Sequence, residues 1–102
     1  MYKVDIIFEI TDKTGRKIRL SKERWQHISS KHSELSSIQK LEDIKNTLIN
    51  PTIIVKHKFD EAKRNYYKYY KDKQRYLTVV VKYLNGEGYI STAFTSRKII
   101  KR

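Results

Sequence analysis

The sequence predicts a single α+β domain over residues 1–102, with the element order β-β-α-α-β-β-β-β. Three observations support this prediction. A strand-like alternation near the N-terminus is followed by two short amphipathic helical patterns. After Pro51 the period changes to two, with β-branched and aromatic side chains. The breaks between these later segments are short and polar, which favours one antiparallel sheet with both helices packed on one face.

Composition supports an ordered globular protein. Of the 102 residues, 38% are hydrophobic and 12% aromatic, with only three glycines and one proline. The absence of cysteine excludes disulfides, thiolate chemistry and cysteine-ligated zinc. The first residues, MYKVDIIFEI, carry acids inside a short apolar stretch, which fits neither a signal peptide nor a transmembrane helix. We therefore expect a soluble, cytoplasmic protein. At the other end of the chain, we expect the basic tail 97–102 to fray.

The N-terminal segment predicts a hairpin. Val4, Ile6, Phe8 and Ile10 alternate with residues that are mostly polar, which is typical of a half-buried strand. The following DKTGRK has the glycine and polar residues of a turn, so KIRL becomes the returning strand.

Two helices are expected next. Ser21 is a favourable N-cap for a helix over residues 22–32. Ser36 and Gln39 have the spacing of a capping box, and the second helix should end before Pro51. Its apolar stripe consists of Leu41, Ile44 and Leu48.

The second half predicts four strands, TIIVK, NYYKYY, YLTVVVKYL and GYISTAF, because β-branched and aromatic residues dominate them. The clearest turn between them is NGEG, since asparagine and glycine tolerate a positive φ. We therefore expect the last two strands to form an antiparallel hairpin.

The net charge of +12 is unevenly distributed and points to a polyanionic partner. Residues 1–50 carry 10 basic and 7 acidic side chains, whereas residues 51–102 carry 13 and 4, a balance of +9. Nucleic acid is the favoured partner. An anionic membrane is less favoured because no basic amphipathic helix is visible. An acidic protein is the remaining alternative.

The first helix holds two of the three histidines. On a helical wheel Trp25, Ile28 and Leu35 define the buried face, and His32 falls inside its arc. His27 lies outside that arc, where it forms a solvent-facing basic ridge with Arg24 and Lys31.

Each histidine has a purely structural alternative. His32 would then be a core residue bonded to backbone, and His27 a surface residue. The two lie about 140° apart around the helix, and no acidic cluster completes a coordination shell, so no metal and no cofactor are expected.

The segment KRNYYKYYKDKQRY, residues 63–76, interleaves five tyrosines with lysines and arginines. Tyrosine rings can stack on unpaired bases while the cations hold phosphates, although tyrosine is also simply a good strand former. The expected nucleic-acid-binding residues are Lys31, Lys63, Arg64, Tyr67, Lys68, Tyr69, Lys71 and Arg75.

Hydroxyl residues gather beside basic ones at the end of the last strand. Ser91, Thr92, Thr95 and Ser96 lie close in sequence to Arg97. Hydroxyls beside a guanidinium can form a phosphate clamp.

Taken together, RLSKERWQHISSKHSEL, YLTVVVK and GYISTAF resemble the barnase, EndoU, colicin and RelE-type (BECR) superfamily of small ribonuclease toxins, closest to its phage-associated and BrnT-like branches. There a helix ends in a Lys/Arg-His pair, and a late strand runs into an Ile-Ser/Thr-Ala segment followed by a basic residue. The likeness covers most of residues 18–98. The matching residues are Lys31-His32, Ile90 with Thr92-Ala93, and Arg97.

The resemblance implies metal-independent cleavage of RNA, in which the 2′-OH attacks the adjacent phosphate and the 5′-oxygen leaves with a proton. His32 can take part only if it lines a cleft between helix and sheet, and His57 is a fallback that no motif supports. The implied site residues are His27 or His32 for proton transfer, Arg24 and Arg97 for the phosphate, and Thr92 or Thr95 for its orientation.

The favoured hypothesis is an endoribonuclease toxin restrained by an acidic antitoxin or immunity protein. The alternatives are a non-catalytic nucleic-acid-binding module that uses a basic, tyrosine-rich sheet face, and a domain that docks an acidic protein. Only the nuclease requires a histidine, which separates it from both alternatives.

Overall fold

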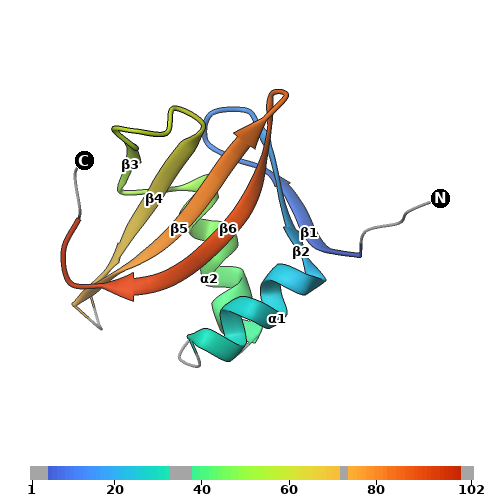
Figure 1. The fold of residues 1–102 in the computed structure, drawn as a ribbon. Helices are drawn as coiled ribbons and strands as arrows, with labels where there is room; N and C mark the ends of the chain where they lie inside the picture. Colours follow the sequence, from blue (N-terminus) through green and yellow to red (C-terminus); the bar gives the residue numbers. More distant parts are fainter. Residues whose placement is uncertain (1–4, 33–37, 72–73, 100–102) are drawn as a thin grey trace.

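The computed structural model describes residues 5–32, 38–71 and 74–99, which form one six-stranded sheet and two helices (Figure 1). The order of strands across the sheet is β1-β2-β6-β5-β4-β3. The α+β class and the predicted element order are confirmed. In chain order the elements are β1 (Ile6–Thr11), β2 (Lys17–Ser21), α1 (Lys22–Lys31), α2 (Ile38–Ile49), β3 (Ile53–Lys56), β4 (Lys63–Tyr70), β5 (Arg75–Leu84) and β6 (Glu87–Ser96).

The sheet departs from the expected antiparallel arrangement where β2 meets β6. These two strands pair in parallel, with Ile18 opposite Gly88 and Arg19 opposite Tyr89. Parallel neighbours need a long crossover connection, and the chain between β2 and β6 contains both helices and three strands. The parallel pair therefore joins the N-terminal hairpin to the C-terminal strands.

Helix α1 begins and ends close to the predicted limits. Ser21 accepts a hydrogen bond from the Arg24 backbone N–H at 3.1 Å, and the His32 N–H closes the last turn on the Ile28 carbonyl at 2.7 Å. The expected capping box at Ser36 and Gln39 concerns side chains outside the described residues, as do Val4, Leu35 and the tail from residue 100. In the described chain, neither helix is long and apolar enough to cross a membrane.

The core lies between the helices and one face of the sheet. Ile28 of α1 and Ile44 and Leu48 of α2 are buried against strand residues such as Val79 and Val81. Trp25 is partly buried and packs against the same cluster, as its position on the helical wheel predicts.

A polar group inside this core is satisfied. Asp12 is buried at the turn after β1 and accepts hydrogen bonds from Thr14, Arg16 and the Tyr66 hydroxyl. Burial, together with the hydrogen bonds to Asp12 and Tyr83, raises the pKa of Tyr66 far above its usual range. Its hydroxyl therefore remains a donor at physiological pH, which ties β4 to the N-terminal hairpin.

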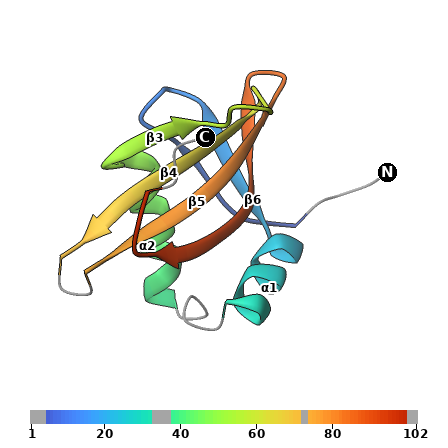
Figure 2. The ribbon, with the colours of Figure 1, turned by 60° about the vertical axis from the view of Figure 1, so that its left-hand side comes forward.

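The other face of β4, β5 and β6 carries no helix among the described residues (Figures 1 and 2). Because side chains alternate along a strand, Asn65 and Tyr67 of β4 share this face with Val80 of β5. Thr92 and Phe94 of β6 complete the row. We refer to this side of the sheet as the open face.

Strands β5 and β6 form the predicted hairpin. Leu84 pairs with Glu87, and the two loop residues Asn85 and Gly86 have φ of 55° and 82°. Positive φ at both central positions is the turn geometry that Asn-Gly favours. Further along, Val80 pairs with Thr92 and Val81 with Ile90, so Ser91 is an extra residue in β6.

A first prediction concerns Gly88, which pairs with Ile18 of β2 and has no room for a side chain. A Cβ at this position would come within 2.3 Å of Ile18 Cδ1 and 2.9 Å of Val81 Cγ1. We expect Gly88→Ala to lower the free energy of unfolding by about 1–3 kcal/mol. Ile18→Val removes the closest atom and should cost about 0.5–1.5 kcal/mol alone.

Urea unfolding of the single and double variants checks this. The double variant should lose less stability than the sum of the single changes, because the shorter side chain at position 18 leaves space for the added methyl. Strict additivity, or a Gly88→Ala variant as stable as the wild type, would show that the contact is not tight.

Candidate active site

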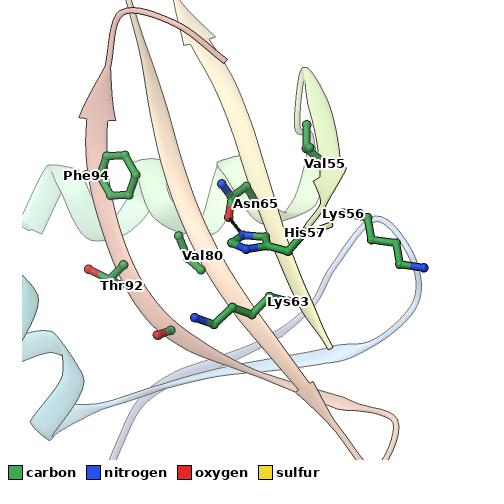
Figure 3. Close-up of a pocket in the computed structure, with 9 residues that line it drawn as sticks. Val55, Lys56, His57, Lys63, Asn65, Val80, Thr92 and Phe94 are labelled. Atoms are coloured by element: carbon green, nitrogen blue, oxygen red, sulfur yellow. Dashed lines mark hydrogen bonds between the residues drawn. The ribbon is translucent and has the colours of Figure 1, made fainter. Parts of the chain in front are cut away.

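A hollow of about 290 Å³ lies on the open face where β3, β4, β5 and β6 are neighbours (Figure 3). Its lining combines ionisable, amide, hydroxyl and apolar side chains without any carboxylate. The lining residues are Val55, Lys56, His57, Lys63, Asn65, Val80, Ser91, Thr92 and Phe94.

His57 directly follows β3, and its ring is held by an amide. Its Nε2 lies 2.6 Å from Asn65 Oδ1, and Asn65 Nδ2 donates to the Tyr67 hydroxyl at 3.1 Å. In this orientation of the amide, Asn65 Oδ1 accepts from His57 Nε2–H, because a carbonyl oxygen has no proton to donate. The neutral ring then presents Nδ1 as a proton acceptor, and imidazole is the side chain best suited to proton transfer near neutral pH.

Lys63 brings a positive charge to the same hollow. Its side chain extends from β4 across β5 toward β6, whereas the Lys56 side chain points away from the hollow (Figure 3). Lys63 forms no ion pair within the described residues, while Lys56 pairs with Glu61 at 3.5 Å. The Asp60 carboxylate interacts with the charge of Lys63 but is not part of the lining. A lysine without a direct ion pair, in a site lined by no carboxylate, is suited to an anionic ligand.

Two hydroxyl-bearing residues of β6 also line the hollow. Neighbouring residues of a regular strand point to opposite faces, yet Ser91 and Thr92 both line the hollow. The extra residue at Ser91 makes this possible, because it shifts the register between Val80 and Val81.

Apolar side chains complete the hollow. Val80 is buried beneath it, and Val55 and Phe94 line opposite sides in Figure 3. Such walls reduce the access of water and strengthen the electrostatic interactions of the polar groups inside.

The loop from His57 to Lys63 has a defined conformation. The His57 N–H bonds to the Lys63 carbonyl at 3.3 Å, and the Lys63 N–H to the Asp60 carbonyl at 3.0 Å. The Ala62 N–H donates to Asp60 Oδ1 at 3.0 Å, and this bond, helped by the charges of Lys82 and Lys63, lowers the pKa of the Asp60 carboxyl. These bonds fix the two ends of the loop that bear His57 and Lys63.

The predicted residues of α1 lie elsewhere. Arg24, His27 and Lys31 are exposed. Arg24 lines a separate hollow with Arg19 and Tyr89, in which Arg19 is paired with Glu9 at 2.6 Å and with Glu87 at 2.8 Å.

His32 reaches the edge of the open face. It is half-buried at the end of α1, and its ring centroid lies 6.1 Å from that of Phe94. Phe94 lines the hollow and His32 is not among its lining residues, so His32 contacts the wall of the hollow from outside.

The predicted residues of β6 are divided between the two faces. Thr92 lies in the hollow with Lys63. Thr95 lines a small hollow on the helix side with Arg75 and Tyr70, and Arg97 is exposed beyond the strand.

The remaining predicted nucleic-acid-binding residues are also divided. Tyr69 is 42% exposed and its ring packs 5.1 Å from that of Tyr76, while Tyr67 is only 1% exposed. Lys68 donates to the Asn50 carbonyl at 2.9 Å, and the Arg64 guanidinium lies over the Tyr83 ring at 5.1 Å. Lys71 is exposed beyond β4.

Three lining residues carry no strong signal in the sequence. His57 is only a fallback there, Asn65 is an ordinary start to NYYKYY, and Ser91 is one of several hydroxyls. The one usable signal is the spacing of His57 and Asn65 on either side of a polar break, which is typical of neighbouring strands of one hairpin. The described residues include no cluster of three or more histidine and acidic side chains suited to a metal ion.

Comparison with known proteins gives one match. No curated protein and no solved structure matches the chain significantly. A family model matches residues 5–102, which is nearly the whole chain. Its description is phage-Barnase-EndoU-ColicinE5/D-RelE like nuclease2. With the fold described above, this match shows that the chain belongs to the phage-associated BECR-like nuclease family.

Proposed function

We propose that the protein is a metal-independent endoribonuclease whose active site is the hollow on the open face. The observation that carries the proposal is that an oriented imidazole, a lysine without a direct ion pair and two hydroxyl-bearing residues line one hollow without a carboxylate. Membership of a nuclease family supports a nucleic-acid substrate.

RNA is the proposed substrate because these side chains suit attack by an internal 2′-OH. In the first step His57 Nδ1 accepts the proton of the 2′-OH, and the oxygen forms a bond to the adjacent phosphorus. Proton transfer of this kind contributes about 10²- to 10⁴-fold to the rate. The Asn65 amide keeps the ring in the tautomer that has Nδ1 available.

The second step breaks the bond between phosphorus and the 5′-oxygen. Lys63 and the hydroxyls of Ser91 and Thr92 stabilise the extra negative charge on the phosphorane oxygens. The Lys63 ammonium donates a proton to the leaving 5′-oxygen. After the reaction His57 releases its proton to solvent and Lys63 regains one from solvent, so both side chains return to their starting state. The products are a 2′,3′-cyclic phosphate and a 5′-hydroxyl, so no water is consumed in this reaction.

The toxin role and its restraint form part of the same proposal. The charge of +9 on residues 51–102 complements an acidic antitoxin or immunity protein, which would compete with RNA for the same cations. The enzyme would act on RNA in the cytoplasm. The predicted alternative, a non-catalytic binding module, shares the cations but has no use for an oriented histidine.

The three histidines of the chain provide a matched series to test the proposal. Purified protein is incubated with RNA in excess EDTA, and the fragments are examined for 2′,3′-cyclic phosphate ends. We expect cleavage by the wild type and a loss of about 10²- to 10⁴-fold in His57→Ala. His27→Ala should cleave like the wild type, because its side chain is exposed on α1.

His32→Ala is the informative third member. It removes a contact of the Phe94 wall, so we expect a smaller loss than in His57→Ala. If His57→Ala is fully active and His27→Ala or His32→Ala loses activity, the catalytic histidine belongs to α1 or its end and not to the hollow. Binding without cleavage by any version would favour the non-catalytic module.

Asn65 is proposed as a positioning residue. Asn65→Ala leaves the imidazole without its partner, so kcat should fall while KM changes little, and the pH–rate profile should shift. Asn65→Asp retains an acceptor for Nε2–H and should restore part of kcat. Equal losses in both variants, with an unchanged pH profile, would show that Asn65 only supports the fold.

Lys63 and Lys56 form a pair that tests contact with phosphate. Affinity for single-stranded RNA, measured with the inactive His57→Ala protein, should decrease with salt. Lys63→Ala should flatten the log–log slope by about 0.7, the change for one phosphate contact. Lys56→Ala should leave the slope nearly unchanged, because Lys56 points away from the hollow (Figure 3). The reverse result would place the phosphate outside the hollow.

A further inference from the structure

The loop between β3 and β4 presents an aromatic ring to solvent. Phe59 is 91% exposed, the largest value among the exposed large hydrophobic residues of the described chain. A single exposed hydrophobic residue is common on protein surfaces. The position of Phe59 distinguishes it from such residues, because in the chain it lies between His57 and Lys63, two of the residues that line the candidate active site.

The loop that bears Phe59 is held by hydrogen bonds and an ion pair on either side of that residue. Asp60 accepts from the Ala62 N–H at 3.0 Å and forms an ion pair with Lys82 of β5 at 3.5 Å. The His57–Lys63 backbone bond closes the loop at its base. Two trans peptide links separate Phe59 from His57, so their Cα atoms lie at most about 7.6 Å apart. A ring on this loop can therefore reach the nucleotide that His57 contacts.

The charges around Phe59 favour an anionic ligand. Lys58 Nζ lies 5.5 Å from the centre of the Phe59 ring. The acids of the loop are engaged elsewhere, since Asp60 pairs with Lys82 and Glu61 with Lys56. Lys58 forms no ion pair within the described residues, so a base on the ring would have a cation beside its phosphate.

We propose that Phe59 is the base-stacking residue of this nuclease, which receives an unpaired base next to the phosphate in the hollow. The inference rests on the proposed function and deepens it, because it defines the substrate as single-stranded RNA. A base in a duplex is stacked between its neighbours and does not present a free face to the ring. Cleavage should therefore be confined to unpaired segments.

The test measures stacking without cleavage. The probe is a short single-stranded RNA that carries 2-aminopurine beside a 2′-deoxy position, so the bond at that position cannot be cut. Wild-type protein should quench the fluorescence of the probe on binding. Phe59→Ala should weaken binding about 5- to 140-fold and abolish the quench, as expected for loss of one stacked base. Phe59→Trp should retain both.

Two controls distinguish stacking from burial of an apolar side chain. Phe59→Leu keeps a large apolar group without a π-face and should behave like Phe59→Ala. Leu84→Ala, at a 58% exposed position on the β5–β6 hairpin, should bind like the wild type. Urea unfolding of each variant should match the wild type, because both side chains are exposed.

Each opposite result has a definite meaning. Wild-type affinity and quenching in Phe59→Ala or Phe59→Leu would overturn the inference and leave Phe59 as a contact for a protein partner. A separate reaction tests the proposed function itself: if the wild type does not cleave unmodified RNA, the proposed function is wrong. Equal cleavage of duplex and single-stranded RNA would also overturn the inference, while leaving the nuclease proposal intact.

Discussion

The candidate site depends on one extra residue in β6. In a regular strand Ser91 and Thr92 would point to opposite faces, and only one hydroxyl could reach the hollow. The register shift at Val80 and Val81 lets both Ser91 and Thr92 line the hollow and still keeps Ile90 and Ala93 in the core. A bulge usually bends its strand and increases the local twist, so one irregularity changes both the shape and the chemistry of the open face.

Strand β6 can carry this irregularity because it is held on both sides. Near its start Gly88 and Tyr89 pair in parallel with β2, and the strand pairs with β5 from Glu87 to Ser96. The absence of a side chain at Gly88 lets Ile18 and Val81 approach the same point, which fixes the position of β6 before the bulge begins. The opposite wall of the hollow depends on a different constraint, the hydrogen-bonded loop from His57 to Lys63.

The sequence predicts the elements better than the site because strands and helices reflect local patterns. Ser21 at an N-cap and Asn85-Gly86 in a two-residue turn act within a few residues, and both are confirmed. The parallel pair of β2 and β6 joins segments about seventy residues apart, with no local signal. His57 and Thr92 likewise come together only through the order of strands in the sheet. The sequence therefore favours the helix that contains two histidines, whereas the imidazole in the hollow belongs to His57, which no motif supports.

The two faces of the sheet also explain why α1 is poorly placed to supply the imidazole. A helix that buries Ile28 against the covered face directs its remaining side chains to solvent or toward the edge of β6. Only a residue at the end of α1 can pass that edge, and His32 does so by packing against Phe94. Because Phe94 is itself part of the wall, the contribution of α1 to the hollow is made through packing. The proposed division of roles follows: the helices stabilise the covered face, and residues of β4 and β6, with the loop between β3 and β4, supply the chemistry on the other.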